Sequence, residues 1–319
     1  MSEHGGSNKA VIAALSANLG IAVTKFIAFL FTGSSSMLAE SVHSVADTGN
    51  QGLLLLGGRR AKRARDTAHP FGYGRERYFY AFIVSLVLFS AGGVFALFEG
   101  VSKVRRPHHV DDPWVAIGVL VVAMCLEAMS FRTARAESKR LKGNHSWVEF
   151  VRRTKNPELP VVLLEDAAAL LGLLFALVGV GLAALSGNGR WDGVGTLAIG
   201  VLLVAVAVTL AIETKSLLIG ESASAEIEKA INDALLAGPE VVRVIHLRTL
   251  HLSPEELLVA AKIAVDHDDS AVTVARGIDA AERRVRAAVA MQTVIYLEPD
   301  LYRDSAPETG APRPDPAAG

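Results

Sequence analysis

The sequence predicts an α-helical membrane protein with six transmembrane helices, followed by a small α+β domain. Mean hydropathy is +0.35 and 51% of the 319 residues are hydrophobic. These apolar residues are grouped in long uncharged runs that alternate with short charged stretches. A run of about 20 apolar residues is long enough to cross the hydrocarbon core of a bilayer as a helix. After residue 214 this pattern ends, and shorter segments of mixed polarity follow.

Composition also excludes some classes of protein and site. The formal net charge of -1 gives no reason to expect nucleic-acid binding. The single cysteine, Cys125, excludes an intramolecular disulfide and a cysteine-rich zinc cluster. Because Cys125 lies in an apolar run, we expect it to be a small buried side chain.

Six segments are candidates for spans: 10–31, 37–58, 79–101, 114–131, 159–185 and 194–212. The second is the weakest by hydropathy because it carries several polar side chains, namely Glu40, His43, Asp47, Asn50 and Gln51. Polar residues at this frequency in a membrane helix indicate a functional face.

Basic residues predict the orientation of these spans. They are concentrated in the connections after the second and fourth spans, at 59–77 and 135–155. Both connections, and both termini, are therefore expected on the cytoplasmic side. Lys103, Arg105 and Arg106 after the third span favour the opposite orientation, but they are fewer.

The C-terminal part alternates helical and strand patterns. Helices are predicted at 223–236 and 272–290, and strands at 241–252, 257–265 and 293–297, an order typical of a small α+β domain. The predicted organisation is a cytoplasmic N-terminus at 1–9, a transmembrane domain at 10–214, a cytoplasmic domain at 215–303 and a disordered tail at 304–319.

Candidate metal ligands lie on the second span. His43 and Asp47 are four residues apart, so both project from one face of a helix, and Glu40 and Asn50 extend that face by a turn each way. An imidazole beside a carboxylate suits Zn²⁺. The alternative is a polar pair that only joins two helices.

The fifth span supplies the facing acidic groups, Glu165 and Asp166. Adjacent residues differ in direction by about 100° on a helix, so only one of them faces a metal bound at the second span. The other orients a ligand, binds a proton or hydrogen-bonds a neighbour. Glu127, on the fourth span, is a lesser candidate.

Three motifs together resemble the cation diffusion facilitator family. They are SSSMLAESVHSVAD from Ser34 to Asp47, HPFGYGRER from His69, and LLIGESA from Leu217. The resemblance covers about residues 10 to 300. The Glu165–Asp166 pair is similar to the branch that includes the mitochondrial zinc transporter of animals.

The resemblance implies six transmembrane helices, a cytoplasmic ferredoxin-like domain, a homodimer and metal/proton antiport. It places His43, Asp47 and Asp166 at the transport site. The position four before Asp166, where the family usually has a histidine, is Val162, which cannot bind metal. Glu165, Glu40, Asn50 or water is then needed to complete the shell, and an oxygen-rich shell tolerates harder metals such as Mn²⁺ or Fe²⁺.

A second family metal site, in the loop after the second span, is matched in part. Asp66 and His69 occupy ligand positions, but Tyr73 replaces the usual second histidine, so this segment is alternatively a structural turn. The last strand of the C-terminal domain carries no histidine, and His246, His251 and His267 are interpreted as surface residues. This domain is therefore expected to mediate dimerisation rather than metal sensing.

The expected function is export of a divalent metal cation, zinc first, from the cytoplasm across a bacterial inner membrane in exchange for protons. The metal is cargo, and no prosthetic group is expected. Alternatives are a Mn, Fe, Co or Cd exporter of the same fold, or a membrane adaptor that does not transport. The sequence contains no His-Glu-x-x-His or Gly-x-Ser-x-Gly motif, so we do not expect an enzyme such as an intramembrane hydrolase.

Overall fold

The protein is described by a computed structural model that covers residues 3–32, 35–107 and 113–302. Within these ranges the side chains are described except at residues 3–10, 25, 28–29, 31–32, 35–43, 46 and 113. The chain divides into two compact units, one of residues 1–220 with 252–254 and the other of residues 221–251 and 255–319. We call them the helical unit and the α+β unit and describe each by itself.

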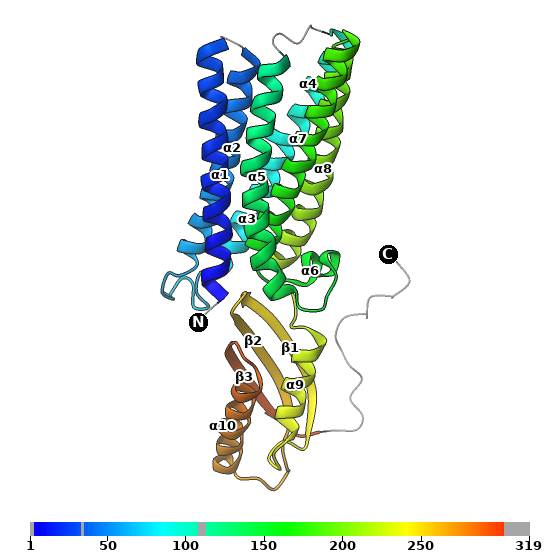
Figure 1. Cartoon of the computed structure of the whole chain (residues 1–319). Helices are drawn as coiled ribbons and strands as arrows, with labels where there is room; N and C mark the ends of the chain where they lie inside the picture. The colour runs from blue at the N-terminus through cyan, green and yellow to red at the C-terminus, as the bar shows by residue number, and fades with distance from the viewer. Residues whose placement is uncertain (1–2, 33–34, 108–112, 303–319) are drawn as a thin grey trace, which may run out of the picture. The chain divides into compact units, whose positions relative to one another are not determined.

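The helical unit contains all six predicted spans within long helices (Figure 1). Its elements are α1 (Glu3–Thr32), α2 (Ser35–Arg60), α3 (Glu76–Val87), the π-helix η1 (Leu88–Val94), α4 (Phe95–Arg105), α5 (Pro113–Lys142), α6 (Trp147–Arg153), α7 (Glu158–Ser186) and α8 (Arg190–Ile219). Because η1 joins α3 to α4 without a break, these three form one continuous rod.

Four helices of the described residues are long and apolar enough to cross a membrane: Glu76–Arg105, Trp114–Lys142, Glu158–Ser186 and Arg190–Ile219. Within α1, Val11–Thr24 is a shorter apolar stretch. The polar residues of α2 keep its hydropathy low. The count of six spans therefore stays a prediction.

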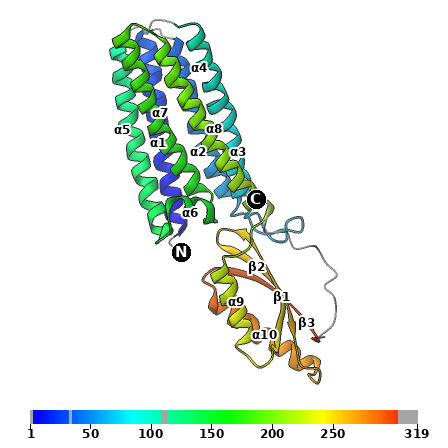
Figure 2. The same ribbon diagram turned by 90° about the vertical axis from the view of Figure 1, so that its right-hand side faces the viewer.

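Close helix contacts hold the bundle together, as the two views in Figures 1 and 2 show for α5, α7 and α8. α1 packs on α2 and α5, α7 packs on α5 and α8, and α4 packs on α8. Small residues permit this approach: a Cβ atom placed on Gly93 would lie 2.7 Å from Val204 Cγ2, and one on Gly200 would lie 2.8 Å from the Leu97 nitrogen. Larger side chains at these positions would push α8 away.

Three local features differ from the sequence prediction. The π-helical turn η1 and the short helix α6 were not predicted. The start of α6 has a readable signal, since the Ser146 side chain accepts a hydrogen bond from the Glu149 backbone N–H at 3.1 Å. Cys125 was expected to be buried, but its side chain is exposed on the surface of α5. It is polarizable and apolar enough to face lipid.

The α+β unit is a three-stranded sheet with two helices. Its elements are α9 (Ala225–Leu236), β1 (Arg243–Ser253), β2 (Glu256–Ala264), α10 (Ala271–Ala288) and β3 (Gln292–Asp300). The strand order is β1-β2-β3, with β2 and β3 parallel and α10 crossing between them. β3 runs past its predicted end at residue 297 through Pro299, which an edge strand tolerates.

Alternation along β2 builds the core of this unit. Leu257, Val259, Ala261 and Ile263 are all buried, as expected for residues two apart on one face of a sheet. They pack with side chains of α9 and α10, among them Ile231, Leu235, Ala281 and Val285. The predicted disordered tail, 304–319, lies outside the described residues.

Candidate functional site: buried carboxyl groups in the helical unit

Glu165 and Asp166 on α7 are directed to different neighbours. Glu165 accepts hydrogen bonds from Asn50 Nδ2 at 3.0 Å and from Gln51 Nε2 at 2.6 Å, both on α2. Asp166 accepts one from Ser130 Oγ on α5 at 2.7 Å. Successive residues of a helix point about 100° apart, which explains the split. Of the roles left open for the second acid, hydrogen bonding to a neighbour is the one observed for Glu165.

Four acidic side chains interact within this region. Asp47 on α2, Glu127 on α5 and Asp166 on α7 all interact electrostatically with Glu165. Glu127, Glu165 and Asp166 have exposed fractions of 6%, 7% and 2%, whereas Asp47 is half-buried. We call these four residues the carboxyl cluster. Carboxyl groups gathered in an apolar interior are stable only when protonated or accompanied by a cation.

Two amide oxygens beside the cluster are also buried. Asn50 Oδ1 and Gln51 Oε1 have no hydrogen-bond partner among the described residues, although each amide donates its N–H to Glu165. Buried polar atoms are nearly always paired. The two oxygens are therefore acceptors available to a proton-bearing group or a cation.

The structure covers only part of the predicted ligand set. Glu40 and His43 belong to α2, but their side chains lie outside the described residues. Within the described part of the chain, no three His, Cys, Asp or Glu side chains lie together as a metal site. Val162, at the family's histidine position, is fully buried in the hydrophobic core. The transport-site ligands thus stay a prediction.

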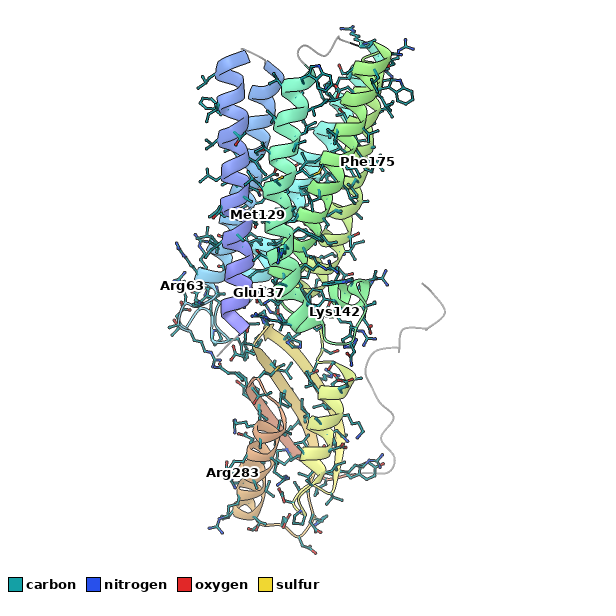
Figure 3. All side chains as sticks on the ribbon, viewed as in Figure 1. Arg63, Met129, Glu137, Lys142, Phe175 and Arg283 are labelled. Atoms are coloured by element: carbon teal, nitrogen blue, oxygen red, sulfur yellow. The ribbon has the colours of Figure 1, made fainter. Side chains whose placement is uncertain are left out.

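Sequence reasoning missed two residues of this site. Ser130 was not considered, although it lies one helical turn after Glu127 on the same span. Gln51 was noted only as one of the polar residues of the second span, without a role. Met129, labelled in Figure 3, marks the level of Ser130 along α5.

The second candidate metal site, Asp66 and His69, is a compact polar turn. Asp66 Oδ1 accepts from the His69 backbone N–H at 2.7 Å, and Asp66 Oδ2 accepts from the Tyr73 hydroxyl at 2.6 Å. The hydrogen bond from Tyr73, followed by the one from the His69 backbone, lowers the pKa of Asp66. The hydrogen bond to Asp66 in turn raises the pKa of Tyr73. His69 Nδ1 lies 3.4 Å from Asp66. Both carboxylate oxygens are already engaged, which favours the structural-turn interpretation.

A buried ion pair at the start of α7 was not predicted. Arg77 Nε on α3 lies 2.7 Å from Glu158 Oε1, and both side chains are almost completely buried. From its sequence context, Arg77 was expected to be only one of the basic residues of the connection 59–77. The pair joins α3 to α7, directly before the predicted third and fifth spans and near the basic end of the bundle.

The histidines of the α+β unit are not all surface residues. His246 and His267 are exposed, as expected, but His251 on β1 has an exposed fraction of 3%. Its backbone N–H donates to the Glu221 carbonyl at 2.9 Å. The prediction of a surface position for His251 was wrong, since His251 and Leu252 are the two buried residues of β1.

Comparison with known proteins identifies the family to which the helical unit is similar. Residues 11–219 match the model of the cation efflux transmembrane domain. The mitochondrial proton-coupled zinc antiporter of Xenopus laevis is 33% identical over 271 residues, which is 84% of this chain and 48% of that protein. Its counterpart in Homo sapiens is 31% identical over 271 residues, 84% of this chain and 47% of the relative.

A bacterial relative matches over most of its own length. The cation-efflux pump FieF of Salmonella arizonae is 26% identical over 251 residues, 79% of each chain. By contrast, the chain spans about half the length of the zinc antiporters that it matches. These matches confirm the resemblance seen in the three sequence motifs. The chain therefore belongs to the membrane-spanning cation efflux, or cation diffusion facilitator, family.

Proposed function

We propose that this chain exports a divalent metal cation, zinc first, from the cytoplasm in exchange for protons. The carboxyl cluster carries this proposal, because it brings acidic side chains of three helices within electrostatic range of one another inside a cation efflux domain. The names of the relatives agree with it, since they include proton-coupled zinc antiporters and a cation-efflux pump.

Asp47 and Asp166 are the proposed carboxylate ligands, with His43 as the nitrogen ligand. Ser130 donates to Oδ2 of Asp166, so we assign the other oxygen, Oδ1, to the metal. A hydrogen bond of this kind orients a ligating carboxylate and fixes which oxygen it presents. Val162 supplies no donor, so the shell is completed by oxygen, which keeps manganese and iron as competitors of zinc.

Glu165 is the proposed proton-coupling group rather than a direct ligand. Both of its oxygens are engaged by the amides of Asn50 and Gln51. It also interacts electrostatically with Asp47 and Asp166, so a dication bound there favours ionised Glu165, and its release favours protonation. When protonated, Glu165 donates a hydrogen bond, and rotation of either amide would present one of the buried amide oxygens to accept it.

Competition between metal and protons then follows from the chemistry of the ligands. A carboxylate binds metal only when ionised, and an imidazole binds it only when neutral. On the cytoplasmic side the metal displaces protons, and on the far side protons displace the metal. A proton gradient across the membrane can therefore drive export.

The membrane arrangement proposed here has six spans, with α1 and α2 joining the four apolar helices. Asn50 and Gln51 are buried, so the polar residues that lower the hydropathy of α2 face protein there rather than lipid. We place both termini in the cytoplasm of a bacterium and the spans in its inner membrane. The α+β unit is the proposed ferredoxin-like dimerisation domain.

The proposal is tested in proteoliposomes that enclose a pH-sensitive dye, with Zn²⁺, Mn²⁺, Fe²⁺, Co²⁺ and Cd²⁺ added in turn. We expect zinc to drive proton movement in the natural protein and Asp47→Asn to abolish it. Glu137→Gln is the matched control, because Glu137 also lies on a long helix but pairs with the exposed Arg140. This control should transport normally.

The outcomes separate the alternatives. A stronger response to another metal would identify the chain as an exporter of that metal. Equal proton movement in Asp47→Asn would contradict the assigned site. No flux with any metal, from folded protein, would favour the membrane adaptor.

A further inference from the structure

A cavity of about 540 Å³ lies outside the carboxyl cluster, between α5, α6, α7 and α8. We call it the α6 pocket. Most of its lining is apolar, and we call Phe131, Leu163 and Leu164 its apolar floor. Trp147 of α6 lines one side, and two arginines, Arg135 and Arg152, also line it. A site of this kind matches a molecule that has an apolar body and an anionic group.

The pocket lies one membrane thickness from the opposite end of the bundle. Trp114 and Arg135 are 21 residues apart on α5, a rise of about 31 Å in a helix, which equals the ~30 Å core of a bilayer. Trp114 and Trp191 begin their helices at one end and are exposed, whereas Trp147 lies at the other. Tryptophans at both ends mark the two membrane interfaces. Because Trp147 and Arg135 line it, the pocket lies at the end of α5 that carries Lys142, labelled in Figure 3.

Cations surround Trp147. Arg135 Cζ lies 5.8 Å from the centre of the indole ring, and Lys142 Nζ lies 5.4 Å from it. Lys142 is fixed further by donating to the His145 carbonyl. These contacts hold positive charge beside Trp147, a lining residue of the pocket, where a phosphate group can form charge-assisted hydrogen bonds.

Helix α6 has the features of an interfacial helix. Phe150 is buried, with its ring 6.3 Å from that of Trp147 in an edge-to-face contact, and it anchors α6 to the bundle. Val148, in contrast, has an exposed fraction of 65%, and Arg152 and Arg153 follow it. A short helix with apolar and basic faces lies in the headgroup region of a membrane.

We propose that the α6 pocket binds an anionic phospholipid of the surrounding membrane. The phosphate lies between Arg135 and Arg152, and an acyl chain runs over Phe131, Leu163 and Leu164. Basic pockets between transmembrane helices on the cytoplasmic side are suited to such headgroups. A soluble anion would leave the apolar floor in water. The proposal depends on membrane insertion of the family fold and not on which ion is transported.

Occupancy has a structural consequence for α7. Leu163 and Leu164 directly precede Glu165 and Asp166 on the same helix. A lipid bound against these leucines would therefore hold the segment of α7 that carries half of the carboxyl cluster. Lipid composition would act on the positioning of the acids and not on their chemistry.

The test uses the fluorescence of Trp147. The chain has three tryptophans, so the Trp114→Phe/Trp191→Phe variant leaves Trp147 alone. It is reconstituted in phosphatidylcholine vesicles that contain a fixed fraction of brominated phosphatidylglycerol or the same fraction of brominated phosphatidylcholine. Bromine quenches a nearby indole, so the ratio of the two quenching effects measures the preference of the pocket for the anionic headgroup.

Matched double variants then assign that preference. Arg135→Gln/Arg152→Gln removes one charge from α5 and one from α6 at the pocket. Arg140→Gln/Arg153→Gln removes the same charges from the same helices at exposed positions, with exposed fractions of 75% and 71% for the two arginines. Ala167→Phe fills the pocket without changing its charge.

We expect stronger quenching by the anionic lipid, corresponding to a binding preference of about fivefold for each arginine. The preference should be lost in the pocket variant, retained in the control variant and reduced in Ala167→Phe. Equal quenching by both lipids, or equal loss in both double variants, would overturn the proposal. Quenching by neither lipid would show that protein, such as a second copy of the chain, covers this face, and would also overturn it.

Discussion

Helix α7 has buried acids at two levels, Glu158 at its first turn and Glu165 with Asp166 further along, and the two levels differ in the kind of hydrogen-bond donor. Glu158, at the first turn, forms a buried ion pair with Arg77 at 2.7 Å. About two turns later, Glu165 and Asp166 accept hydrogen bonds from Asn50, Gln51 and Ser130, which carry no charge. All three acids have exposed fractions below 10%. The same helix thus carries one acid with a permanent cation and two acids with neutral donors.

This difference separates structural roles from the proposed transport role. A permanent guanidinium neutralises Glu158 and leaves no place for a second cation. Among the described side chains, the donors to Glu165 and Asp166 are neutral and orient the two acids without adding a positive charge, so the balance can be supplied by a metal ion or by protons in turn. A site that must release its cation needs the second arrangement.

The largest effect is expected at the permanent pair. Arg77→Leu leaves Glu158 buried without its cation, which should destabilise the helical unit by about 3–5 kcal/mol. Thermal unfolding in detergent measures this loss. Since an apolar pair of similar size avoids the uncompensated charge, Arg77→Leu/Glu158→Leu should recover most of the stability. A double variant as unstable as the single one would contradict the structural role of the pair.

A smaller effect, on binding rather than stability, is expected at the neutral donor Ser130. Ser130→Ala removes the hydrogen bond that orients Asp166 and should weaken zinc binding by about 10-fold. Asp166→Asn, which removes the proposed ligand itself, should weaken it further. Calorimetric titration with zinc measures both. Ser138→Ala is the control, because Ser138 is a buried serine on the same helix, two turns away; affinity unchanged by Ser130→Ala would remove Ser130 from the site.

The ion pair of Arg284 and Glu240 in the α+β unit extends the comparison to the effect of pH on stability. Burial opposes ionisation of Glu240, but hydrogen bonds from its own backbone N–H and from Arg284 outweigh this and lower the pKa of Glu240. Because the folded pKa lies below the ordinary value, the pair stabilises the unit above about pH 4.3, and this contribution is lost as the pH falls through the folded pKa.

Glu240→Gln should therefore cost about 1 kcal/mol near neutral pH and progressively less in acid. Thermal unfolding followed by circular dichroism at several pH values checks this convergence. Asp233→Asn serves as the control, since Asp233 pairs with Lys229 on an exposed helix face. A constant difference between Glu240→Gln and the natural protein at every pH would exclude the assigned ionisation.

The smallest effect on transport is expected at the loop acid Asp66. Its two oxygens are engaged by Tyr73 and by the His69 backbone, so it resembles Glu158 in being fully partnered within the protein. Asp66→Asn should leave zinc-driven proton movement nearly unchanged in proteoliposomes. A loss as large as that in Asp47→Asn would show that the loop binds metal.

Much of the fold could be predicted because its signals are local. Long apolar runs identified the long helices of the helical unit, helical period identified α10, and a segment rich in Val, Ile and Leu at 257–265 identified the central strand of the sheet. The missed elements lack such signals. A π-helical turn such as η1 differs from an α-helix by its hydrogen bonds and not by its composition, and α6 has only 7 residues, too few for a clear period.

The acidic residues of the candidate site could be recognised in the sequence, but the residues that hydrogen-bond to them could not. Asp47, Glu165 and Asp166 are conspicuous as charges in apolar runs. Their neighbours are distant in sequence: Gln51 and Glu165 are separated by 114 residues, and Ser130 and Asp166 by 36. The Arg77–Glu158 pair joins residues 81 apart. Which acid receives a cation and which receives a neutral donor depends on helix packing, which no local pattern encodes.

Proton release on zinc binding tests the central proposal most directly. Calorimetric titration of the detergent-solubilised protein with Zn²⁺, repeated in two buffers of different ionisation enthalpy, gives the number of protons released. We expect release from the natural protein, about one proton fewer from Glu165→Gln, and no binding at this site in Asp47→Asn. Zinc binding without proton release, or with the same release in Glu165→Gln, would contradict an exchange of metal and protons at the carboxyl cluster.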